Sequence, residues 1–163
     1  MSRTYTDIDI KEKVKKALQT LLECDLYLLE VHAHERSVSH RLACYLQKEF
    51  PDYNVDLEYN RMNDLKKKLK GIKECSEQRR KETVYPDIIV HKRGKKDNLL
   101  VIELKTSNLS EKSKKCDIKK LELFTSDKDF EYKLGLFIEF KCYNPLLKWF
   151  KKDHNLILGD KTS

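Results

Sequence analysis

The stretch VYPDIIVHKRGKKDNLLVIELKT, residues 84–106, contains two apolar runs on either side of a short basic loop. Residues 85–92 and 98–106 are rich in Ile, Val and Leu, and the connection between them contains Gly94. Strand-forming runs separated by five residues that include a glycine are typical of a β-hairpin. We therefore expect two antiparallel strands that lie side by side.

Three charged residues interrupt these apolar runs, namely Asp87, Glu103 and Lys105. If Lys92 pairs with Asn98, antiparallel alignment places Asp87 directly opposite Glu103. Directly opposed side chains have Cβ atoms about 4.5–5.5 Å apart, so two carboxylates in these positions repel each other. Because strand side chains alternate between faces, Lys105 shares the face of Glu103 and supplies one compensating positive charge.

A divalent cation would compensate this repulsion further. Mg²⁺ prefers oxygen ligands and is commonly held by one or two carboxylates together with water or substrate phosphate. The alternative is that the charges are solvated on an exposed strand face, as Glu-x-Lys pairs often are. Their position among Ile, Val and Leu favours a metal site.

Apolar spacing predicts the remaining elements, with helices indicated by steps of three and four residues and strands by alternation. Segment 24–33 is ambiguous between helix and strand. The expected helices cover 10–21, 35–50, 117–124 (with Asp117 near the N-cap) and a short segment from Pro145; the expected strands are 53–60, 132–140 and, at the end, 155–159.

Composition indicates one domain, 1–163, with an anionic partner. The chain has 163 residues, 39% of them hydrophobic, and a formal net charge of +7. This imbalance favours nucleic acid, because no basic amphipathic helix points to a membrane surface. No apolar run reaches the roughly 18 residues of a membrane span and the start of the chain lacks a signal-peptide pattern, so we expect a cytoplasmic protein. The five cysteines suggest reduced, mostly buried thiols.

Pro86-Asp87 followed by Glu103-x-Lys105 resembles the PD-(D/E)xK nuclease superfamily. The order of predicted elements over about residues 10–141 is also similar to that of this superfamily. The resemblance implies a restriction-endonuclease-like α/β core of the order αβββαβ, in which helices flank a mixed four-stranded sheet.

The resemblance also implies roles for individual residues. Asp87 and Glu103, together with the backbone carbonyl of Leu104, would hold Mg²⁺, with Mn²⁺ as a substitute. Lys105 would position or activate the attacking water. Many members add a glutamate from the first core helix, and Glu35 matches this position; stabilisation of the helix N-terminus is the alternative role of Glu35. One or two metal ions would both be compatible with this set.

Two basic segments are candidates for nucleic-acid binding. The charged insert 61–83, between the first two core strands, has nine basic and four acidic residues. It could be a phosphate-binding flap or a solvated charge run. The hairpin loop is the second basic segment. The candidate residues are Arg61, Lys66, Lys67, Lys68, Lys92 and Arg93.

These observations predict a Mg²⁺-dependent endonuclease that hydrolyses DNA phosphodiester bonds. The alternative is a catalytically silent nuclease-fold module that binds nucleic acid or a partner protein. RNA is the second candidate substrate, and a homodimer or a partner protein would supply specificity. No Gly-x-Ser-x-Gly elbow, phosphate-cradling glycine loop or cysteine nucleophile motif is present, which argues against the corresponding enzyme classes.

Overall fold

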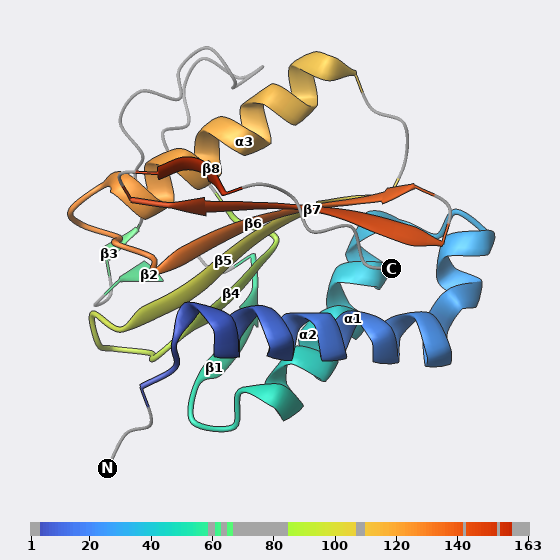
Figure 1. The fold of residues 1–163 in the computed structure, drawn as a ribbon, viewed down its shortest axis with the longest axis horizontal. Coiled ribbons are helices and arrows are strands. Elements are labelled where there is room, and N and C mark those ends of the chain that lie inside the picture. Colours follow the sequence, from blue (N-terminus) through green and yellow to red (C-terminus); the bar gives the residue numbers. More distant parts are fainter. Residues whose placement is uncertain are drawn as a thin grey trace.

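The computed structural model describes residues 4–58, 61–62, 65–66, 85–106, 110–141, 143–152 and 154–157. The part described is an α/β structure in which a mixed β-sheet lies between helices (Figure 1). Helices α1 (Asp7–Glu30) and α2 (Glu35–Glu49) cover one face, and α3 (Glu111–Ser126) covers the other. The α/β class predicted from the sequence is confirmed.

Helix α1 is longer than the predicted 10–21. It begins with a capping box, in which the side chain of Thr6 accepts from the backbone N–H of Asp9 and the side chain of Asp9 accepts from the backbone N–H of Thr6. It continues through the ambiguous segment to Glu30, with a kink where Asp25 leaves helical geometry. The Asp25 carboxylate accepts hydrogen bonds from Tyr45 and Arg41 of α2, so contacts between the two helices hold the kinked turn in place.

Helix α2 confirms the helix predicted for 35–50. The ring of His34 caps its N-terminus by accepting from the backbone N–H of Arg36. Its apolar stripe, which includes Val38, Leu42 and Leu46, is fully buried against the sheet and α1.

The sheet has the strand order β1-β4-β5-β6-β7-β8. Strands β5 and β6 are parallel, and every other neighbouring pair is antiparallel. The strands are β1 (Asn54–Leu57), β4 (Ile88–His91), β5 (Asn98–Lys105), β6 (Leu134–Lys141), β7 (Asn144–Lys151) and the short β8 (His154–Ile157). The expected four-stranded sheet is therefore wrong, because β7 adds a fifth strand to β1, β4, β5 and β6, and β8 extends the edge.

The prediction of a short helix from Pro145 is wrong, because this segment is strand β7. Buried and less buried side chains alternate along its first half, and it pairs with β6 from Lys141↔Asn144 to Gly135↔Phe150. Pro145 lies near the start of the strand, where the missing N–H disrupts the pairing least.

The predicted hairpin of β4 and β5 is confirmed. Ile88 pairs with Ile102 and Val90 with Leu100, which is the expected alignment. A bulge after Val90 pairs His91, rather than Lys92, with Asn98. The observed pairing therefore differs from the predicted register only at the loop end of the hairpin.

Each face of the sheet packs on its own apolar core. Leu104 and Ile102 belong to the larger core beneath α1 and α2. Val101 and Ile89 pack with Phe124 and other residues of α3. Because strand side chains alternate, Glu103 and Lys105 lie on the α3 face with Val101.

Within the charged insert, Arg61–Met62 (β2) and Leu65–Lys66 (β3) form a separate two-stranded sheet. Residues 63–64 and 67–84 lie outside the described residues.

The cysteines differ from the expectation of reduced and mostly buried thiols. Cys24 and Cys44 are free but exposed, and Cys116 is disulfide-bonded. In the part of the chain described here, no helix is long and apolar enough to cross a bilayer.

Candidate active site

Asp87 and Glu103 come together where β4 begins. Asp87 directly precedes β4, and the Ile88↔Ile102 pair places it opposite Glu103, as the sequence predicted. Oδ2 of Asp87 accepts a hydrogen bond from the backbone N–H of Leu104 at 2.9 Å. This bond fixes the Asp87 carboxylate against β5, next to Glu103. Burial raises the pKa of Asp87.

Glu103 is the most enclosed acid of this group, with only 1% of its surface exposed. Its Oε2 lies 3.2 Å from Nζ of Lys120. Its Oε1 is buried and has no hydrogen-bond partner among the described residues. Burial raises the pKa of Glu103 well above its usual value, and the nearby carboxylates of Asp87 and Asp117 act in the same direction. A buried carboxylate oxygen without a hydrogen-bond partner is energetically unfavourable.

Lys105 lies between two acids from different helices. Its Nζ is 3.2 Å from Oε1 of Glu35 on α2 and 3.1 Å from Oδ2 of Asp117 on α3. Burial alone would lower the pKa of Lys105, but the charges of Asp117 and Glu35 outweigh burial and raise it. Two ion pairs therefore fix the ammonium group of Lys105 in place, unlike that of an exposed surface lysine.

Helix α3 adds two residues that the sequence analysis did not assign to the site. Nζ of Lys120 lies 2.6 Å from Oδ1 of Asp117, one turn away on the same helix face. The prediction that Asp117 lies near an N-cap is wrong, because α3 begins at Glu111 with Ser110 as its cap. The available signal was the helical spacing of Asp117 with Leu121 and Phe124, which puts a carboxylate on the buried stripe.

Glu35 reaches the site from the first turn of α2. It contacts Lys105 and lines the same pocket as Asp87, and its role as a metal ligand stays a prediction. Its ion pair with Lys105 means that the side chain does more than lie near the positive end of the helix dipole.

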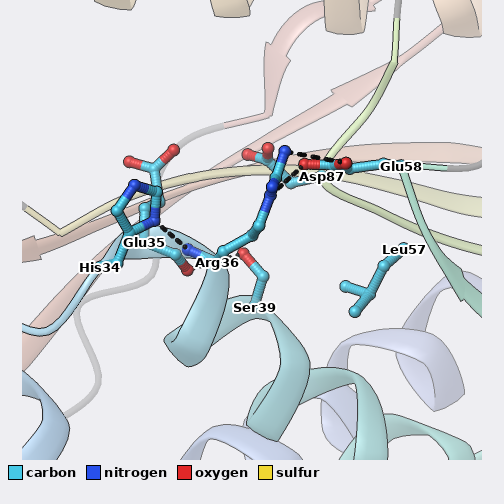
Figure 2. A pocket seen from close by; sticks show the side chains of 7 residues that line it. All are labelled: His34, Glu35, Arg36, Ser39, Leu57, Glu58 and Asp87. Carbon is cyan, nitrogen blue, oxygen red and sulfur yellow. Dashed lines mark hydrogen bonds and ion pairs between the residues drawn. The ribbon is translucent and has the colours of Figure 1, made fainter.

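A pocket of about 320 Å³ opens beside this cluster. Figure 2 shows the side chain of Arg36 extending to Glu58, with Asp87 beside this ion pair. Arg36 donates to both oxygens of Glu58, at 2.8 and 3.2 Å. The lining residues are His34, Glu35, Arg36, Ser39, Leu57, Glu58 and Asp87. Glu35 and Asp87 therefore belong to both the pocket and the cluster.

The charges of the cluster do not balance. The carboxylates of Glu35, Asp87, Glu103 and Asp117 surround the ammonium groups of Lys105 and Lys120, which leaves a formal excess of two negative charges. Within the described residues, no three side chains of His, Cys, Asp or Glu are arranged to hold a metal ion together. The lysines lie between the acids instead.

The hairpin loop does not lie at this cluster. Asn98 and Glu103 are five residue steps apart along β5, which corresponds to about 17 Å. Lys92 lies 3.1 Å from Oδ2 of Asp97, and Arg93 donates to both oxygens of Asp56.

Two of the other candidates for nucleic-acid binding lie in the small sheet of the insert. Arg61 begins β2 and Lys66 ends β3. Lys67 and Lys68 lie outside the described residues.

Comparison with protein-family models and with curated proteins finds no match to this chain. The chemistry of the cluster and its pocket is therefore what indicates a function.

Proposed function

We propose that this protein is a divalent-metal-dependent nuclease that hydrolyses DNA phosphodiester bonds. The observation that carries the proposal is Oε1 of Glu103, which is buried without a hydrogen-bond partner among the described residues. The carboxylate of Asp87 lies beside it, and Lys105 is fixed nearby by two ion pairs. Buried charges are normally paired or bind metals. The resemblance of Pro86-Asp87 and Glu103-x-Lys105 to the PD-(D/E)xK superfamily supports the same reaction.

Mg²⁺, or Mn²⁺ in its place, fits the donor set because both carboxylates offer hard oxygen ligands. Asp87 and Glu103 would hold the ion, with the backbone carbonyl of Leu104 as a third oxygen. The formal excess of two negative charges matches one divalent cation. When bound, such an ion polarises a phosphodiester and makes water a better nucleophile.

The residues of the chain have separate tasks in this proposal. Lys105 orients the attacking water and offsets the charge that develops on the phosphate. Glu35 and Asp117 hold the Lys105 ammonium group in position from opposite sides. The pocket beside Glu35 and Asp87 admits the backbone of the substrate. DNA is the proposed partner because the chain carries a net positive charge, with specificity supplied by a homodimer or a partner protein.

The test is cleavage of single-stranded, double-stranded and branched DNA, and of RNA, with Mg²⁺, Mn²⁺ or EDTA. We expect metal-dependent DNA cleavage that is lost in Asp87→Asn and Lys105→Met. Asp52→Asn removes an exposed carboxylate elsewhere and should cleave as the wild type does. Cleavage that persists in EDTA or in both site variants would contradict the proposal.

A catalytically silent binding module is the second candidate. It is favoured by the lysines that lie between the acids and by the lack, across the described ranges, of any three-ligand metal group. Tight binding of nucleic acid or of a partner protein without cleavage, under every metal condition, would select this candidate over the nuclease.

A further inference from the structure

Lys120 belongs to α3 and contacts the carboxylate of Glu103 on strand β5. It lies 3.2 Å from Oε2 of Glu103 and 2.6 Å from Oδ1 of Asp117. Its side chain is 21% exposed, whereas that of Glu103 is 1% exposed. Lys120 therefore contacts a buried acid while keeping part of its own surface open to solvent.

The neighbours of Lys120 determine what its charge does. Without a cation, Lys120 is the only ammonium group in ion-pair contact with Glu103 among the described residues. Lys105, by contrast, contacts Glu35 and Asp117. If Asp87 and Glu103 share a divalent cation, the formal charge of the cluster becomes zero. That sum includes Lys120, but Glu103 then has the cation as a second positive partner, so Lys120 is no longer its only one among the described residues.

We propose that Lys120 is a second substrate-binding lysine that pairs with Glu103 in the metal-free protein and with a phosphate oxygen once Glu103 binds a cation. This inference rests on the proposed nuclease function. It assigns α3 a role at the phosphate that differs from that of Lys105. A purely structural Lys120 would instead keep its contact with Glu103 in every state.

The first measurement is metal affinity without substrate. Mn²⁺ titration calorimetry should show about tenfold tighter binding by Lys120→Met than by the wild type, because an ammonium group that competes for Glu103 is gone. Lys115→Met removes an exposed lysine from the same helix and should bind Mn²⁺ as the wild type does. Equal Mn²⁺ affinity of Lys120→Met and the wild type would overturn the proposal.

The second measurement is DNA binding with Ca²⁺ in place of the catalytic ion. Lys120→Met should bind DNA about tenfold more weakly than the wild type. The slope of log affinity against log salt should fall by about one, as expected for one lost phosphate contact. Lys120→Arg should retain the wild-type slope. An unchanged slope in Lys120→Met would overturn the proposal, because a structural lysine does not change the number of phosphate contacts.

Thermal melting shows whether the variants are folded. If Lys120→Met is unfolded under assay conditions, Lys120→Gln removes the charge but keeps a donor for Glu103, and the same two outcomes apply to it. A wild-type protein that binds neither Mn²⁺ nor DNA would overturn the nuclease proposal and this inference together. Normal wild-type binding with unchanged Lys120 variants would overturn this inference alone.

Discussion

Nζ of Lys105 lies 3.2 Å from Oε1 of Glu35, although the two residues are 70 positions apart in the sequence. This ion pair connects the first turn of α2 to the end of β5. It brings a helix that packs on one face of the sheet into contact with a lysine from the other face, beside the start of β4. Glu35 also lines the pocket, so the ion pair lies at the edge of this cavity.

Glu35→Gln and Glu35→Asp separate the two roles considered for Glu35. Asp keeps a negative charge at the helix N-terminus but is too short to retain the contact with Lys105. We expect the free energy of unfolding of both variants to be about 1–2 kcal/mol below that of the wild type, because a partly buried ion pair is broken in each. Both variants should also lose most of the cleavage activity. Urea unfolding and cleavage rates provide the measurements. If Glu35→Asp unfolds and cleaves as the wild type does, the role of Glu35 is limited to its negative charge at the helix N-terminus.

Metal ions should stabilise the folded wild-type protein. Binding to the folded state alone adds about 2.7 kcal/mol at a concentration 100 times the dissociation constant. We therefore expect the melting temperature to rise with Mg²⁺ or Mn²⁺ and to return to its starting value after EDTA. Glu103→Gln and Asp87→Asn should show no such rise, because each loses an anionic ligand. Glu111→Gln, on the exposed start of α3, is the matched control and should respond as the wild type does.

The elements next to the site were predictable because each has a strong local pattern. The alternation and loop of the β4–β5 hairpin identified the opposed acids, and the apolar stripe of α2 placed Glu35 at its start. Strand β7 was missed because Leu146, Leu147, Trp149 and Phe150 suggest a helix after Pro145, whereas pairing with β6 decides the outcome. Tertiary context here overrides a local pattern.

The contribution of α3 to the site could not be predicted in the same way. The contacts of Lys120 and Asp117 depend on how α3 crosses β5, which spacing within the helix does not determine. A charged residue on an apolar stripe shows only that a partner is needed. The unpaired oxygen of Glu103 becomes apparent only when the surroundings of that residue are known.

The hairpin loop should respond to alkaline pH through Tyr53. Its hydroxyl donates to Asp97 at 3.0 Å, and Nζ of Lys92 lies 4.7 Å from the centre of its ring. Burial, with help from the nearby Asp97 carboxylate, raises the pKa of Tyr53 from 10.0 to about 12. The protonated phenol therefore adds stability that is complete below pH 10 and is lost as the pH rises from 10 to 12.

Tyr53→Phe should remove this component. Its free energy of unfolding should be about 1 kcal/mol below that of the wild type at pH 8, because the hydrogen bond is lost. The difference should shrink above pH 10, where only the wild type loses the contribution of the phenol. Urea unfolding at several pH values measures both effects, with the exposed Tyr85→Phe as control. A constant difference up to pH 12 would contradict this account.

Substitutions in the basic insert and in the hairpin loop should affect DNA binding differently. Lys92 and Arg93 are already paired with Asp97 and Asp56, so we expect Arg93→Ala to lower stability and to change DNA affinity less than about threefold. Simultaneous replacement of Lys66, Lys67 and Lys68 by Ala should reduce the salt slope of DNA binding by about two to three, if each lysine contacts a phosphate. Fluorescence anisotropy over a range of salt concentrations measures both slopes. If the triple variant keeps the wild-type salt slope while Arg93→Ala has a lower one, the hairpin loop rather than the insert binds the nucleic-acid backbone.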